Sequence, residues 1–215
     1  FGLIVDKEYM IRKNRRLKRS ISNANLKQQA TVEDVDFDTI RKLKRAEFLE
    51  LAGGIWISNH HNLVITGPTG IGKSFLACSL ADKACKLGFQ VRYYRANTLI
   101  SELLLAKADG SYPKLVTQLA KIHLLIIDEW LRDSLNQAHS RELLDILDDR
   151  YRKASTIFCS QLSVADWHAK IEDPTIADAM LDRIVHDSHR IVLDGPSMRK
   201  QTSPIQGNRA SLRSD

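Results

Sequence analysis

Cysteine is scarce and widely spaced in this chain. The 215 residues include three cysteines, Cys78, Cys85 and Cys159, and no two of them have the CxxC spacing. An odd number without that spacing favours neither a disulfide scaffold nor a zinc site. We therefore expect a protein of the reducing cytoplasm.

Long uncharged apolar runs are also missing. No segment approaches the roughly 18 apolar residues that a membrane-spanning helix needs, so we expect no membrane partner. The chain begins at Phe1 rather than Met, and no cationic start leads into an apolar run. We therefore predict no secretory signal and expect native residues to be missing before Phe1.

The length and apolar content fit one domain with appendages. A chain of 215 residues should bury roughly 70% of its unfolded surface, and apolar residues, at 43%, can supply that core. Disorder throughout the chain and a fusion of two enzymes are both disfavoured.

Excess charge is confined to the first 30 residues. The net charge is +6. Residues 1–30 hold eight Lys or Arg against two acidic residues, and the remaining residues hold 24 of each sign. The basic character of the protein therefore comes entirely from its N-terminal segment.

That segment has helical periodicity, with an apolar stripe opposite a basic one. Met10, Leu17, Ile21 and Ala24 form the apolar stripe, which we expect to dock, and Arg12, Arg15, Arg16 and Arg19 form the basic stripe. A solvated face and a membrane-surface helix are alternatives. We favour nucleic acid over a membrane surface because the apolar stripe lacks Trp and Phe. Four phosphate contacts would give a salt slope of about −3.6.

The rest of the chain alternates short apolar runs with amphipathic stretches, which predicts an α/β fold with a central parallel sheet. Residues 30–38 are acidic and turn-like and are interpreted as a linker, and 39–52 return to helical spacing. We predict strands at 63–66, 90–94, 123–127, 155–160 and 190–193, and helices at 73–87, 98–107, 112–120, 135–153, 163–171 and 175–186. The expected division is a basic helical segment with linker (1–38), a nucleotide-binding domain (39–201) and a flexible tail (202–215).

A phosphate-binding loop is predicted directly after the first of these strands. The residues from Gly67 to Ser74 match GxxxxGK[ST] between a strand and a helix. Glycines let successive backbone N–H groups converge on phosphate oxygens at a helix N-terminus. Lys73 should reach the β- and γ-phosphates, and Ser74 should ligate Mg²⁺. The predicted ATP-binding set is Gly67, Pro68, Thr69, Gly70, Ile71, Gly72, Lys73, Ser74 and Phe75.

Two carboxylates follow the apolar strand LLII. Such a strand is buried on both faces, so Asp128 and Glu129 should emerge at its carboxyl end, where open α/β sheets bind ligands. Asp128 is a candidate magnesium ligand, and Glu129 is a candidate for polarising the attacking water. An additional strand between the two motifs suits the P-loop branch in which one strand separates the two motif strands.

Three further residues are candidates for catalysis. Ser160 ends the fourth strand and could direct its hydroxyl at the γ-phosphate, or be an ordinary strand-terminal residue. Arg183 lies in the amphipathic stretch ADAMLDRIVH and is either an ion-paired surface residue or an arginine finger for a neighbouring subunit. Arg199, after the last strand, could reach the phosphates from the C-terminal side.

The whole pattern resembles the IstB family, bacterial AAA+ ATPases that assist an insertion-sequence transposase and are related to DnaC-type helicase loaders. The likeness includes RKNRRLKR, GPTGIGKS, LLIIDEW, STIFCSQL, DPTIADAMLDRIVHDSHRI and SMRK. It implies a P-loop AAA+ fold, with Arg183 similar to the arginine finger, Arg199 to sensor 2 and Ser160 to sensor 1. It also implies ATP-dependent self-assembly on duplex DNA and recruitment of a transposase in a bacterial cytoplasm.

Three other functions stay open on the sequence. A helicase loader would share the ATPase core but prefer single strands. A small-molecule kinase would work without DNA, and a nucleotide switch would bind ATP without hydrolysing it.

Overall fold

The computed structural model of the protein describes residues 2–37 and 42–198. Five parallel strands form its central sheet in the order β2-β3-β4-β1-β5. They are β1 (Asn62–Thr66), β2 (Val91–Arg95), β3 (Leu124–Trp130), β4 (Ser155–Ser160) and β5 (Ser188–Val192). Strand β4 separates β1 from β3, as the prediction for the two motif strands required.

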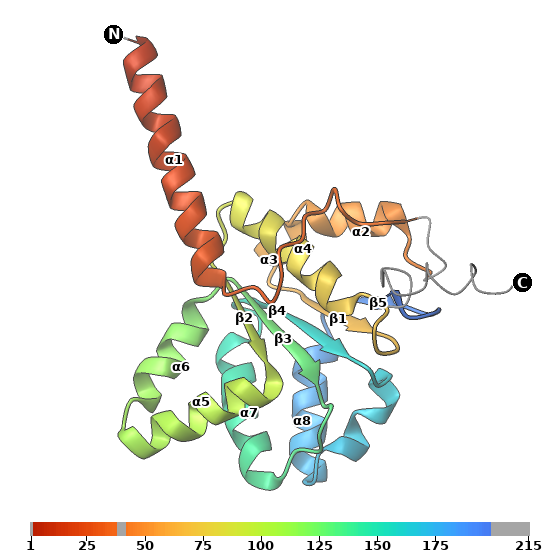
Figure 1. Cartoon of the computed structure of the whole chain (residues 1–215). Coiled ribbons are helices and arrows are strands. Elements are labelled where there is room, and N and C mark those ends of the chain that lie inside the picture. Colours follow the sequence, from red (N-terminus) through yellow and green to blue (C-terminus); the bar gives the residue numbers. More distant parts are fainter. Residues whose placement is uncertain (1, 38–41, 199–215) are drawn as a thin grey trace, which may run out of the picture.

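Eight α-helices are described along with two short 3₁₀ helices. They are α1 (Gly2–Ala24), α2 (Arg45–Ala52), α3 (Ile55–Ser58), α4 (Lys73–Lys86), α5 (Ala96–Asp109), α6 (Tyr112–Lys121), α7 (Gln137–Arg150) and α8 (Pro174–Val185). Helices cover both faces of the sheet (Figure 1). The predicted α/β fold is therefore confirmed, with the strands displaced by at most three residues at any end.

Continuous apolar strands build both halves of the core because alternate residues face opposite sides of the sheet. Leu124 and Ile126 pack with α4 and α2, whereas Leu125 and Ile127 pack with α5, α7 and α8. The inner strands β1, β3 and β4 are therefore buried on both faces, whereas the edge strand β5 is largely exposed.

The N-terminal helix docks only through its second half. Ala24 is buried, and Leu17 and Ile21 pack against the core, but Met10 is 52% exposed. Met10 was expected on the docking stripe, and the structure corrects this, because the first half of α1 projects away from the sheet layers (Figure 1). None of the described helices is long and apolar enough to cross a membrane.

Residues 25–37, which we call the connector, are more than a linker. Ala30, Val32 and Val35 are buried in the same apolar cluster as α4. Thr31 closes a turn by donating its hydroxyl to the Asp34 carboxylate at 2.8 Å. The acidic, turn-like composition predicted a linker, but from Ala30 onward every second or third residue is apolar and packs against the core cluster.

Two predicted helices differ from the structure. The helix expected at 163–171 is a pair of 3₁₀ turns, Val164–Asp166 and His168–Lys170, around the fully buried Trp167. A continuous helix does not form here because the Trp167 ring is buried and Ile171 forms a β-bridge with Leu135. Of the helix expected at 39–52, α2 begins only at Arg45, and residues 38–41 lie outside the described part.

A buried arginine ties α6, α7 and β4 together. Arg150, only 2% exposed, donates to the carbonyls of Leu119, Ile122 and Ser155 at 2.6, 2.8 and 2.5 Å. Two of these carbonyls lie at the C-terminal end of α6, where helical acceptors lack partners. The guanidinium therefore supplies hydrogen bonds to three backbone carbonyls from one buried position.

Candidate phosphate-binding site

The loop between β1 and α4 adopts backbone conformations that only glycine takes easily. Gly67, Gly70 and Gly72 have φ angles of 148°, 82° and 101°. A Cβ on Gly70 would overlap the Ser197 hydroxyl, and one on Gly67 would lie 2.5 Å from the Leu193 carbonyl oxygen. Close packing against residues 193–198 and left-handed geometry therefore both require glycine here.

The loop ends at the N-terminus of α4. Gly72 is the N-cap of α4 and offers no side-chain cap, so the first amides of this 14-residue helix can meet an anion. The Lys73 ammonium donates to the carbonyls of Gly67 and Pro68 at 2.5 and 2.8 Å. The loop thus holds its lysine close to the amides that would receive phosphate.

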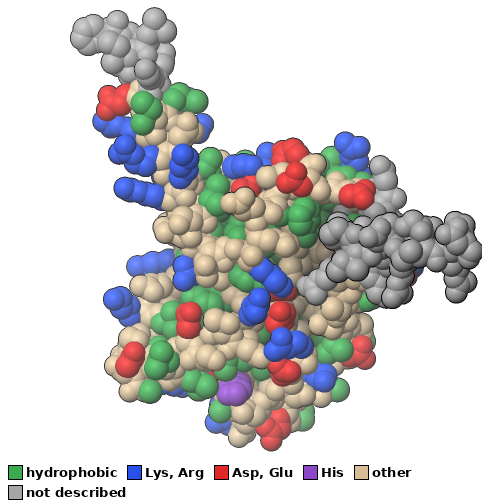
Figure 2. Space-filling view, viewed as in Figure 1, with side chains coloured by type: hydrophobic (Ala, Val, Ile, Leu, Met, Phe, Trp, Pro, Cys, Tyr) green, Lys and Arg blue, Asp and Glu red, His purple; other side chains and the backbone are tan. Residues whose placement is uncertain are grey.

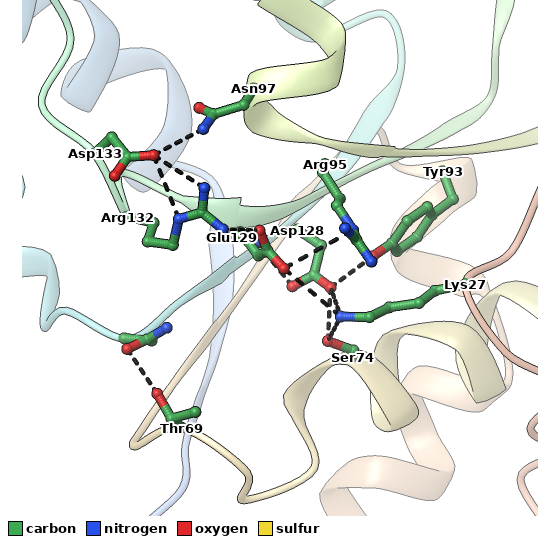
Figure 3. A network of polar contacts seen from close by, with 11 residues as sticks. Lys27, Thr69, Ser74, Tyr93, Arg95, Asn97, Asp128, Glu129, Arg132 and Asp133 are labelled. Atoms are coloured by element: carbon green, nitrogen blue, oxygen red, sulfur yellow. Dashed lines mark hydrogen bonds and ion pairs between the residues drawn. The ribbon is translucent and has the colours of Figure 1, made fainter.

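Ser74 and Asp128 meet at the carboxyl edge of the sheet (Figure 3). The Ser74 hydroxyl donates to Asp128 Oδ2 at 2.6 Å, and the Tyr93 hydroxyl donates to the same oxygen at 2.6 Å. The Lys27 ammonium lies 3.1 Å from that oxygen and donates to Ser74 Oγ at 3.2 Å. Sequence reasoning paired Ser74 with Asp128 but missed Lys27 and Tyr93.

This network keeps the Asp128 carboxylate ionised. Burial raises its pKa, but hydrogen bonds from Ser74 and Tyr93 and the charge of Lys27 outweigh burial, so the pKa of Asp128 is lowered overall. Conversely, burial and the Asp128 carboxylate raise the pKa of Tyr93, which keeps its hydroxyl a donor. Hydroxyl and carboxylate oxygens are the donors that Mg²⁺ prefers, and a cationic group already lies against both, so these residues fit a magnesium ion.

Glu129 lies in a strained bulge beside Asp128. Its φ is 58°, and the pairing of β3 with β4 shifts between Ile127 and Trp130. The Glu129 carboxylate pairs with Arg132 at 2.6 Å and lies 3.9 Å from both Lys27 and Arg95. A left-handed non-glycine residue costs about 1–3 kcal/mol and persists where surrounding structure enforces it, often at functional sites.

Ser160 is not directed at the loop. It is fully buried, and its hydroxyl donates to the Trp130 carbonyl at 2.8 Å. The next residue makes the contact instead, because the Thr69 hydroxyl donates to the Gln161 side-chain oxygen at 2.7 Å (Figure 3). Residues alternate faces along a strand, and the one-residue difference decides which side chain reaches the loop.

A cavity of about 410 Å³ lies between the loop, the connector and the end of the described chain. Its lining residues are Lys27, Gln28, Asp34, Asp36, Gly70, Gly72, Lys73, Ser74, Phe75 and Met198. This volume lies in the range of small-ligand sites. Phe75, expected in the ATP-binding set, therefore does line the cavity together with connector residues that the sequence did not indicate.

Of the two candidate catalytic arginines, Arg183 lies within the described residues and Arg199 does not. The Arg183 carbonyl accepts from Asn62 at 3.1 Å, which places it beside the start of β1, whereas the loop follows the end of β1. The Arg183 guanidinium pairs with Asp148 and donates to the Ala179 carbonyl. Arg199 lies outside the described residues, although Met198 donates its amide to the Gly70 carbonyl at 2.9 Å.

The basic stripe of α1 borders a second cavity. Arg12, Arg15, Arg16 and Arg19 are all exposed, and blue side chains cluster along the helix in Figure 2. Arg16 and Arg19 line a cleft of about 600 Å³ with Arg92 and Lys121. No acidic residue lines this cleft among the described residues.

The fold and the site together define a P-loop nucleotide-binding protein of the AAA+ class. Solved structures with this fold include DnaI (TM-score 0.66, 18% identity, 77% of this chain and 91% of that one). The AMPPCP-bound DnaA from Aquifex aeolicus is similar too (TM-score 0.65, 18% identity, 79% of this chain and 51% of that one).

The chain belongs to the family of IstB-like ATP binding proteins, whose model matches residues 1–205. It is 47% identical over 199 residues to the insertion sequence ATP-binding protein y4pL of Sinorhizobium fredii, covering 93% of this chain and 81% of that protein. It is 41% identical over 162 residues to the insertion sequence IS1162 ATP-binding protein of Pseudomonas fluorescens, covering 75% and 70%. The protein is thus an ATP-binding protein of insertion-sequence type, as the sequence resemblance predicted.

Proposed function

We propose that this protein hydrolyses magnesium ATP and uses the cycle to regulate transposition on DNA. The observation that carries the proposal is the contact between Ser74 and Asp128, with Glu129 beside it, at the end of a glycine loop and a helix N-terminus. Phosphate-binding donors, a fitting metal pair and a candidate base therefore share one edge of the sheet.

Each residue has a distinct role in the proposed reaction. The loop amides bind the phosphates, and the Lys73 ammonium turns from the Gly67 and Pro68 carbonyls to the β- and γ-oxygens. Ser74 and Asp128 would hold Mg²⁺, which when bound neutralises charge developing on the phosphates. Glu129 orients and polarises the attacking water once it is released from Arg132.

Hydrolysis is tested by comparing two variants with the native chain. Glu129→Gln should keep ATP binding but lower turnover by about 10²-fold or more, because a general base is lost while the fold is kept. Lys73→Ala should weaken both binding and turnover. Unchanged turnover in Glu129→Gln would mean that the protein is a nucleotide switch or uses another base.

We propose that DNA is held by the basic face of α1 and the cleft beneath it. Arg12, Arg15, Arg16 and Arg19 are exposed cations, and Arg16 and Arg19 share the cleft with Arg92 and Lys121. Arg12 also pairs with Glu8, but both side chains are exposed and such a pair contributes little. A cluster of exposed cations of this kind fits the phosphates of a nucleic-acid backbone. Arg92 is fixed by donating to the Asn23 carbonyl at 2.8 Å, so the strand edge and α1 present their charges together.

Likeness to DnaI and DnaC supports a helicase loader as the second candidate. Binding of duplex and single-stranded DNA in the presence of an ATP analogue separates the two. A transposition regulator should prefer duplex DNA and stimulate a transposase encoded with it, whereas exclusive affinity for single strands favours the loader.

Self-assembly completes the proposal. Because Arg183 lies beside the start of β1 and the phosphate loop beyond its end, we propose that Arg183 completes the site of a neighbouring subunit. ATP at that interface would then close the assembly on DNA, and hydrolysis would open it. Arg199 remains a candidate for contacting the phosphates of its own subunit.

A further inference from the structure

The connector brings one cation into the phosphate site. Lys27 lies three residues beyond the end of α1, and its side chain is 23% exposed. Its ammonium contacts Ser74 Oγ and Asp128 Oδ2, at 3.2 and 3.1 Å, and lies 3.9 Å from Glu129. These are the two oxygens that fit a magnesium ion and the carboxylate proposed to activate water (Figure 3).

We propose that the Lys27 ammonium and Mg²⁺ are alternative occupants of the Ser74 and Asp128 oxygens, so that metal loading releases the connector from the site. The inference rests on the proposed function and adds to it a link between the nucleotide and the DNA-binding helix.

Distance and charge make the two occupants exclusive. Mg²⁺ binds oxygen at about 2.1 Å. An ammonium still touching either oxygen would therefore lie within about 5 Å of a divalent cation, where like charges repel strongly in a part-buried site. Asp128 is almost fully buried, with 3% of its side chain exposed, so water screens this repulsion poorly.

The rest of the connector is placed to respond when Lys27 leaves. Gln28, Asp34 and Asp36 line the same cavity as Lys27, and the Cys78 thiol on α4 lies against the backbone of Lys27 and Gln28. Cys78 is fully buried. Movement of the connector would therefore change both the protection of its own amides and the accessibility of this thiol.

The metal competition is tested with Lys27→Met. Binding of a fluorescent ADP analogue is measured against free Mg²⁺ concentration in the full chain. Removing the competing ammonium should lower the Mg²⁺ concentration for half-saturation by about fivefold, since a part-buried ion pair contributes about 1 kcal/mol. Lys27→Arg keeps the charge and should stay close to the native chain, as should the control Lys18→Met on the exposed surface of α1.

The release is tested by hydrogen exchange and thiol labelling of the native chain with ADP. Adding Mg²⁺ should speed amide exchange at residues 25–29 and labelling of Cys78, whereas Cys159, buried in the sheet, should stay unlabelled. In Lys27→Met, exchange should already be fast before Mg²⁺ is added.

Three results would overturn the proposal. These are a higher or unchanged Mg²⁺ requirement in Lys27→Met, slower exchange of the connector with Mg²⁺, and no change in exchange. If the protein binds ADP with a Mg²⁺ dependence but shows any of these, the link through Lys27 fails and the proposed function stands. If it binds no nucleotide with or without Mg²⁺, both fail.

Discussion

Replacing Arg183 by alanine should abolish ATP turnover, and a second inactive variant should restore part of it. Asn62, which contacts the Arg183 carbonyl, and Thr66, which precedes the loop, are the two ends of β1. Four steps along a strand span about 13 Å. The guanidinium also points to Asp148 on α7, so we expect it to serve a neighbouring subunit's nucleotide.

The expected changes in turnover follow from an arginine that acts across the interface between two subunits. Loss of an arginine finger lowers turnover by about 10³-fold or more. A Lys73→Ala subunit has a defective phosphate site but an intact Arg183, and an Arg183→Ala subunit has the reverse. An interface in the mixture is therefore active only when the phosphate site comes from an Arg183→Ala subunit and the arginine comes from a Lys73→Ala subunit. In a random equal mixture about a quarter of interfaces meet that condition, and turnover should recover to about a quarter of the native value.

The assay is steady-state phosphate release at fixed total protein with duplex DNA. Asp148→Asn is the matched control, because it removes the ion pair and keeps the arginine. That pair is partly exposed and contributes at most about 1 kcal/mol, so the control should stay folded and active. If turnover in the mixture stays near zero, no more than the sum of the two variants measured alone, Arg183 does not act on a neighbouring subunit. An inactive Asp148→Asn would indicate a structural role for Arg183.

Four further predictions test other parts of the structure. Gly70→Ala should weaken ATP binding, measured by titration, because its Cβ would overlap Ser197; Gly88→Ala has a similar φ of 97° in open space and should not. Replacing Arg12, Arg15, Arg16 and Arg19 with Gln should make the negative slope of log affinity for duplex DNA against log salt shallower by about 3.6, and an unchanged slope would place the DNA elsewhere. Arg150→Met should lower the free energy of unfolding by about 3 kcal/mol in urea, because three carbonyls each lose a hydrogen bond from the buried guanidinium. A loss below about 1 kcal/mol would contradict that role. Because the pKa of Asp128 is lowered in the folded protein, its ionisation stabilises the fold above the unfolded value of about 3.9. The stability difference between native and Asp128→Asn protein should therefore shrink as pH falls below about 4, and a difference that grows there would show the opposite sign.

Local patterns in the sequence were enough to predict most of the architecture. Short apolar runs such as LLII, bounded by polar residues, are typical of strands buried on both faces, and a glycine loop of this pattern between a strand and a helix is typical of phosphate binding. The pairing of Ser74 with Asp128 followed from these two motifs, because the carboxyl ends of parallel strands meet at one edge of the sheet.

Other parts of the site could not be predicted because they depend on contacts between distant segments. Lys27 counted only as one basic residue of the N-terminal segment, and Tyr93 only as part of a strand, yet both contact Asp128. Ser160 was a candidate because it ends the fourth strand, but its hydroxyl donates to the Trp130 carbonyl, and the following residue, Gln161, contacts Thr69 instead.

The sequence by itself determined the order of strands and helices along the chain, the glycine loop proposed to bind phosphate and the location of excess positive charge, because each depends on residues close together in the chain. Only the tertiary structure shows that the connector lines the cavity beside the glycine loop and that Lys27 contacts Asp128, 101 positions further along the chain. It also shows that Arg183 lies at the opposite end of β1 from that loop. These features arise from how the sheet, α1 and the connector pack against one another, and no local pattern encodes the distance between them.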